Sequence, residues 1–185
     1  MHERGSLSAD ASGLPPPGGS PVLTGLPPVV SERTVVLVLG SFPGVASLRA
    51  GQYYAHPQNH FWRILQALWP QHPLPGPAHY ALRCEWLLAR GLGLWDVYAR
   101  CERVGSLDSR IRNAQVNDFA RLRADCPRLA AIAHNGAESF RHARSTALLE
   151  VPVFRLPSTS PANASWSFER KLNAWAELLA RHGLV

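Results

Sequence analysis

TVVLVLG, residues 34–40, is the strongest strand signal in this chain of 185 residues. An unbroken apolar run that is rich in β-branched residues and ends in glycine is typical of a strand buried on both faces of a parallel sheet. Weaker apolar runs predict three more strands, at residues 91–98, 129–134 and 151–156. Apolar residues spaced three and four positions apart predict helices between and after these strands. The helices are expected at residues 59–68, 78–89, 118–125 and 137–144 and around an apolar stripe of Phe168, Leu172, Trp175, Leu178 and Leu179.

This alternation of strands and helices predicts an α/β fold, with three α/β/α layers built on a mainly parallel four-stranded central sheet. Residues 1–32 are dominated by glycine, proline, serine and other small residues, which bury too little surface to order a chain. We therefore expect a flexible tail at residues 1–32 and a single domain at residues 33–185. A short extended piece near residues 27–30 could dock on that domain.

The composition limits the classes of function. Basic residues outnumber acidic ones by 19 to 13, and the resulting charge of +6 and pI near 9.9 favour a polyanionic partner. The three cysteines form no CxxC pair and the histidines form no HExxH motif, so we expect no metal and no cofactor. No apolar run reaches the roughly 18 residues of a membrane span, so a cytoplasmic protein is expected.

The segments that directly follow the strands are the candidate sites, because ligands bind outside the carboxyl ends of the strands in a parallel sheet. Patterns of a serine hydrolase elbow, a Walker loop and a dinucleotide fingerprint are absent from them. In the first segment, Gly40 and Gly44 allow a sharp turn and a close approach to a ligand. The four segments are Gly40-Ser-Phe-Pro-Gly44, Trp95-Asp96, His134-Asn135-Gly136 and residues 157–163.

Several residues near these strand ends also have purely structural explanations. Asn59 precedes a predicted helix, where asparagine is a preferred cap. Asn135 precedes a glycine and suits a turn. Tyr53 and Tyr54 are adjacent, so in an extended chain only one of them faces a pocket and both suit a core or its rim. Residues 157–161 suit a loop with serine and threonine turns.

Three motifs nevertheless follow one another in a recognisable order. They are Gly-Ser-Phe-Pro-Gly at 40–44, Ala-His-Pro-Gln-Asn-His-Phe-Trp at 55–62 and Leu-Pro-Ser-Thr-Ser-Pro-Ala-Asn-Ala at 156–164. The chain resembles the uracil-DNA glycosylase superfamily, the first two motifs being similar to its mismatch-specific uracil/thymine branch and the third to its hypoxanthine-DNA glycosylases. The resemblance extends from about residue 35 to the last predicted helix. The chain departs from the family at Phe42, where the mismatch-specific enzymes carry a catalytic asparagine and the uracil-specific ones an aspartate.

The resemblance implies roles for individual residues. The hypoxanthine branch shares the gap at Phe42 and carries its catalytic asparagine in the His-Pro-x-Asn motif, which makes Asn59 the residue that positions water. Tyr54 corresponds to the aromatic residue that stacks on the extruded base, and Tyr53 is left for packing or the rim. Main-chain groups at residues 41–42 and the side chain of Asn135 are candidates for reading the edge of the base. The expected base-binding residues are Gly40, Ser41, Phe42, Pro43, Tyr54, His56 and Asn135. The expected DNA-intercalating loop contains Pro157, Ser158, Thr159, Ser160, Pro161 and Asn163.

The function implied is that of a DNA glycosylase that flips out a deaminated base, hypoxanthine, uracil or both, and hydrolyses its N-glycosidic bond to initiate base excision repair. The expected partner is double-stranded or single-stranded DNA that contains such bases, bound by a monomer. The protein is then expected to associate with the nucleoid when it acts on DNA. The only lysine, Lys171, lies on the last predicted helix, so we expect a monofunctional enzyme without lyase activity. Two alternatives remain open: a non-catalytic module that binds damaged DNA, and an α/β enzyme that acts on free nucleosides.

Overall fold

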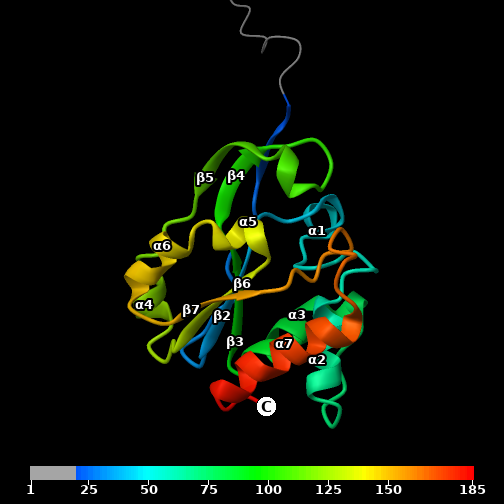
Figure 1. Ribbon diagram of the computed structural model, residues 1–185, viewed down its shortest axis with the longest axis vertical. Helices are drawn as coiled ribbons and strands as arrows, with labels where there is room; N and C mark the ends of the chain where they lie inside the picture. Colours follow the sequence, from blue (N-terminus) through cyan, green and yellow to red (C-terminus); the bar gives the residue numbers. More distant parts are fainter. Residues whose placement is uncertain (1–19) are drawn as a thin grey trace, which may run out of the picture.

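The computed structural model describes residues 20–185, and its centre is a four-stranded parallel sheet (Figure 1). The strands lie in the order β3-β2-β6-β7 and all pairs are parallel, which confirms the predicted three-layer α/β class. Every residue of β2 is buried, as its apolar run predicts. The bounds are β2 (Val36–Gly40), β3 (Leu92–Asp96), β6 (Ala131–Asn135) and β7 (Val153–Leu156).

The helices cover both faces of this sheet, because successive side chains of a strand point to opposite sides. Val36 and Val38 of β2 belong to one core cluster, under α2, α3 and α7. Leu37 and Leu39 belong to a second cluster, which includes residues of α4 and η3. Figure 1 shows α2, α3 and α7 grouped on one side of the sheet and α4 and α6 on the other. The elements are α1 (Val45–Ala50), α2 (Phe61–Leu68), η1 (Pro77–His79), α3 (Tyr80–Leu88), η2 (Asp108–Arg110), α4 (Leu122–Asp125), α5 (Ala137–Phe140), α6 (Ala143–Thr146), η3 (Ala147–Leu149) and α7 (Phe168–Arg181).

A second, antiparallel sheet was not predicted. It has the order β1-β4-β5, with β1 (Val22–Thr24), β4 (Tyr98–Glu102) and β5 (Arg112–Val116). The apolar run at 91–98 divides at Val97, because the chain leaves the parallel sheet there to pair with β1 and β5. The divided run looks continuous in the sequence, since both halves are apolar and both are extended.

The segment 20–32 belongs to the fold instead of forming a tail. β1 pairs with β4, and Val29 forms a bridge with Leu94, so the piece near 27–30 docks as expected. The composition of this segment does not indicate that it is structured, because only a few of its apolar residues, Leu26 and Val29 among them, contact the core. The rest of the predicted tail, residues 1–19, lies outside the described residues. Within 20–185, no helix has the length and apolar character that a membrane span requires.

Candidate active site

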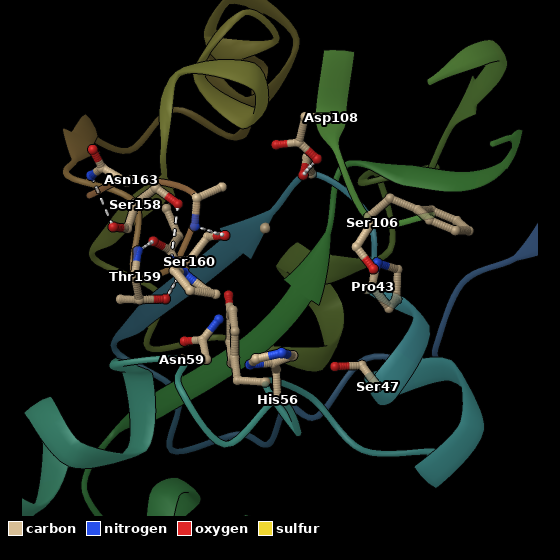
Figure 2. Close-up of a pocket in the computed structure, with 18 of the residues that line it drawn as sticks. Pro43, Ser47, His56, Asn59, Ser106, Asp108, Ser158, Thr159, Ser160 and Asn163 are labelled. Atoms are coloured by element: carbon tan, nitrogen blue, oxygen red, sulfur yellow. Dashed lines mark hydrogen bonds between the residues drawn. The ribbon is translucent and has the colours of Figure 1, made fainter. Parts of the chain in front are cut away.

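The candidate site lies at the carboxyl ends of the parallel strands, where ligands bind in sheets of this kind. A cavity of about 660 Å³ opens at the carboxyl ends of the parallel strands and is lined by all four of the segments that follow them. Each residue predicted to catalyse, to bind the base or to form the DNA-intercalating loop contributes to its lining. In Figure 2, Asn59 and His56 face the segment 158–163 across this space, and Ser106 and Asp108 close a third side.

Asn59 combines a capping contact with a place in the pocket. Its Oδ1 accepts a hydrogen bond of 3.0 Å from the backbone N–H of Phe61, the first residue of α2. This bond fixes the orientation of the amide group, and within the described part of the chain no hydrogen bond engages Nδ2. The side chain is half-buried and lines the cavity (Figure 2). The structural and the functional interpretation of Asn59 therefore hold at the same time.

The two adjacent tyrosines differ in their packing, although both contribute to the cavity lining. Tyr53 is buried in the core, and its hydroxyl donates to the carbonyl oxygens of Leu26 and Pro27. Tyr54 lines the cavity with one ring face stacked on Phe61, at a centroid distance of 4.1 Å. Its backbone has a φ of +54°, a left-handed conformation that is unusual for a residue other than glycine. This conformation turns the chain between the two rings, and burial raises the pKa of both phenols.

Phe42 packs as a core residue at the edge of the pocket. It is buried in the second cluster, and the guanidinium of Arg103 lies 5.1 Å from the centre of its ring. The turn around it is held by the next strand, because the N–H groups of Val97 and Tyr98 donate to the carbonyl oxygens of Gly40 and Ser41. The position that carries a water-activating group in related motifs therefore has an apolar side chain in a fixed turn.

The loop 157–163 is held in place by Asn135. The side chain of Asn135 donates from Nδ2 to Oγ1 of Thr159 and accepts from the backbone N–H of Thr159, both at 2.9 Å. The carbonyl oxygen of Thr159 accepts from the N–H of His60, which joins the loop to the turn that carries Asn59. Since Thr159 is fully buried, the structure differs from the prediction that it belongs to a DNA-inserting surface. Asn135 holds the loop, and its contact with a base stays a prediction.

Sequence reasoning named the segment Trp95-Asp96 as a candidate but gave no role to three charged residues in or beside the site. Asp96 ends β3 opposite Gly40 and is 3% exposed at the floor of the cavity. Its burial, together with repulsion from Asp108, raises the pKa of the carboxyl group to about 8, although Arg103 opposes the shift. The Oδ1 atom of Asp108 accepts from the hydroxyl of Ser41 at 2.7 Å, and Arg103 donates to the carbonyl oxygen of Pro43. Only the location of Asp96 at a strand end was a usable signal in the sequence.

His134 lies behind the site and not in it. The ring is fully buried, with Nδ1 2.7 Å from Oγ of Ser139 and Nε2 2.9 Å from Oγ1 of Thr146. Burial lowers the pKa of His134 to about 4, so the ring is neutral at pH 7. It supports α5 and α6 under the strand end that carries Asn135. Among residues 20–185, no group of three or more His, Cys, Asp or Glu side chains is placed to hold a metal ion.

Comparison with known proteins identifies relatives of this arrangement. A family model described as the uracil DNA glycosylase superfamily matches residues 27–179. Two proteins named hypoxanthine DNA glycosylase, from Methanosarcina barkeri and Methanosarcina acetivorans, are each 35% identical to the chain and cover 85% of it and 98% of their own length. The solution NMR structure of a Methanosarcina acetivorans protein described as a uracil DNA glycosylase has a TM-score of 0.75 and 32% identity, covering 88% of this chain and 99% of that one. The chain belongs to the uracil DNA glycosylase superfamily.

Proposed function

We propose that the protein is a monofunctional DNA glycosylase that excises hypoxanthine, and with lower efficiency uracil, from DNA. One observation carries the proposal: an amide at Asn59, an aromatic face at Tyr54 and polar groups at the strand ends line one cavity of about 660 Å³. Two relatives that match this chain over nearly their whole length are named hypoxanthine DNA glycosylase. A base inside a duplex is inaccessible to such a cavity, so the nucleotide is flipped out before the reaction.

Tyr54 provides the stacking surface for the flipped base. One face of its ring packs on Phe61, and Tyr54 contributes to the cavity lining, so we expect the other face to meet the base. Stacking uses a π-face that every base has, so it contributes affinity and little discrimination. Discrimination needs hydrogen bonds to the base edge. The carbonyl oxygens of Gly40 and Ser41 already accept hydrogen bonds from the N–H groups of Val97 and Tyr98. We therefore expect this turn to bind the base edge through its own backbone N–H groups.

Asn59 positions the water that attacks C1′ of the sugar. Its amide has no useful basicity, but the bond from Phe61 N–H fixes its plane, and Oδ1 keeps a second lone pair for a water molecule. Asn59 therefore contributes to the rate by orienting the water. A displacement of a reacting group by about 1 Å can lower the rate by about 100-fold or more. The departing base must be stabilised by other groups of the pocket.

Two segments at the mouth of the cavity are placed to contact DNA. The loop 157–163 forms one side, with Pro161 exposed, and the segment that follows β4 forms the other, with Leu107 49% exposed. We expect these segments to fill the gap left by the flipped base, and exposed arginines such as Arg155 on the cavity rim to contact phosphates. The positive net charge favours this partner over a free nucleoside.

Among residues 20–185, no lysine lines the cavity, whereas a strand-cleaving lyase needs an amine there. The only lysine in the chain, Lys171, is buried on α7, where its Nζ is 3.4 Å from the carbonyl oxygen of Ser160. It supports the loop from behind and does not contribute to the cavity lining. We therefore expect an enzyme that releases the base, leaves an abasic site and does not cut the strand. We also expect it to act as a monomer.

The test uses labelled DNA, duplex and single-stranded, with one deoxyinosine or one deoxyuridine opposite each normal base. Abasic sites are revealed by alkali, and wild type is compared with Asn59→Ala. Gln58→Ala is the matched control, because this neighbouring amide is exposed and does not line the cavity. We expect alkali-dependent cleavage with wild type and Gln58→Ala and a loss of about 100-fold or more with Asn59→Ala.

The other outcomes identify the alternatives. Tight binding of damaged DNA without base release would show a binding module. Hydrolysis of free deoxyinosine but not of DNA would show a nucleoside enzyme. Strand breaks without alkali would contradict a monofunctional enzyme.

A further inference from the structure

Asp96 occupies the floor of the cavity in an unusual state. Its Oδ2 atom is buried, and among the described residues it has no hydrogen-bond partner. The neighbouring strand leaves room for the carboxyl group, because a Cβ atom built on Gly40 would lie 2.3 Å from Oδ1 of Asp96. A buried polar atom without a partner is costly. Because Asp96 contributes to the cavity lining, a ligand in the cavity can approach its carboxyl group.

The groups around Asp96 do not neutralise a negative charge. Arg103 and Asp108 face it from the segment after β4, Tyr53 and Tyr54 from the turn before α2, and Tyr80 from α3. Of these only Arg103 is cationic. It lies outside ion-pair distance of the carboxyl group and donates to a main-chain carbonyl of the turn after β2.

The charge state follows from these surroundings. Burial and the repulsion from Asp108 exceed the attraction of Arg103, and they raise the pKa of Asp96 to about 8. The carboxyl group is then largely protonated at neutral pH, and it can donate a hydrogen bond or a proton to a base that reaches the floor.

On the basis of the proposed function, we propose that Asp96 is the general acid of the reaction and transfers its proton to N7 of hypoxanthine as the base departs. The N9–C1′ bond breaks and its electron pair stays with the base. The proton of the Asp96 carboxyl group forms the N7–H bond, so hypoxanthine leaves as a neutral molecule. The water held by Asn59 forms the new bond to C1′ and releases one proton to solvent. The Asp96 carboxylate regains a proton from solvent when the product leaves.

The proposal separates purine from pyrimidine substrates. Hypoxanthine has a lone pair on N7 that is free to accept a proton. Uracil has no comparable ring nitrogen, and its departing anion spreads its charge over two carbonyl oxygens, for which hydrogen bonds are sufficient. Removal of the acid should therefore slow the excision of hypoxanthine much more than the excision of uracil.

The test measures single-turnover excision by wild type and Asp96→Asn on three substrates: deoxyinosine, deoxyuridine and 7-deazadeoxyinosine, which carries a carbon in place of N7. Asp125→Asn, which removes an exposed carboxylate on α4, is the control for the loss of one negative charge. We expect Asp96→Asn to slow deoxyinosine excision by about 100-fold or more, the usual size of a general-acid contribution, and deoxyuridine excision by less than about 10-fold.

The 7-deaza substrate distinguishes proton transfer from support of the fold. Wild type should excise it as slowly as Asp96→Asn excises deoxyinosine, and the variant should add no further loss. The wild-type rate on deoxyinosine should also fall as the pH rises above about 8. Equal slowing of all three substrates by Asp96→Asn, or a wild-type rate that does not depend on N7, would overturn the proton-donor role while the proposed function stands. A wild type that excises none of the three would overturn both.

Discussion

Replacing Asp96 with asparagine should stabilise the protein while it slows the reaction. A carboxyl group that is buried on folding makes the free energy of unfolding of the protein depend on pH, because its pKa differs between the folded and unfolded states. The pKa of Asp96 is about 8 in the folded protein and 3.8 for the free side chain. Below pH 3.8 both states hold the proton. As the pH rises from there to about 8, only the unfolded state loses it, so the folded state is progressively disfavoured.

The size of the effect follows from the same two values. Each pH unit between them costs the wild type about 1.4 kcal/mol, so from pH 5 to pH 8 its free energy of unfolding should fall by about 4 kcal/mol relative to Asp96→Asn. This is an upper limit, since local relaxation lets water reach the charged carboxylate. The titration of His134 occurs in both proteins and cancels in the difference.

The assay is urea unfolding of wild type and Asp96→Asn at several values between pH 5 and pH 8, with Asp125→Asn as the exposed control. The difference between Asp96→Asn and wild type should grow with pH, and Asp125→Asn should follow the wild type. Parallel curves for wild type and Asp96→Asn would mean that Asp96 ionises normally in the folded state, which would refute both the buried neutral carboxyl and its use as an acid. A more stable but slower variant is the combination expected when a residue is retained for function at a cost to the fold.

Three further outcomes are expected. Gly40→Ala should reduce deoxyinosine excision by about 100-fold, because its Cβ would collide with the carboxyl group at the floor, whereas Gly76→Ala, whose Cβ meets open space, should retain the wild-type rate in the same assay. The pKa of His134 is about 4 in the folded protein and 6.5 for the free side chain, so the wild type should lose about 3 kcal/mol of its free energy of unfolding as the pH falls from 6.5 towards 4. His134→Gln should abolish this loss in urea unfolding. Leu107→Ala should slow excision from duplex DNA by about 10-fold but not from single strands, because base flipping costs a few kcal/mol only in the duplex. The control is Val104→Ala, which should leave both rates unchanged because Val104 is exposed but does not line the cavity.

The sequence was sufficient for features that depend on neighbouring residues. The run of residues 34–40 identifies the central strand, and the ends of the apolar runs then locate the cavity, because parallel strands bring their carboxyl ends to one edge. The helix around residues 168–181 was also predictable, since its apolar stripe is regular. These signals are local, so long-range packing does not alter them.

Features that depend on distant contacts were not predictable. Asn135 and Thr159 are 24 residues apart, and nothing near either residue indicates that the two bond each other. Burial and the repulsion from Asp108 raise the pKa of Asp96, and Arg103 opposes the shift. Asp108 and Arg103 come near Asp96 only because the chain crosses to a second sheet after Val97. Composition also concealed the strand at 22–24, whose partner lies about 80 residues further along.

The position of Phe42 bears on how the proposed reaction is divided between Asn59 and Asp96. With that ring packed under Arg103, the turn after β2 contributes no side chain that can activate water. In the proposed mechanism, Asn59 orients a water molecule without basicity, and Asp96 offers a proton to the departing base. Such a site gains its rate mainly on the leaving-group side, so it should favour bases whose departure is helped by protonation. The ratio of deoxyinosine to deoxyuridine excision by wild type therefore measures this division: a large ratio that collapses in Asp96→Asn supports it, and a ratio near one shows that water positioning alone sets the rate.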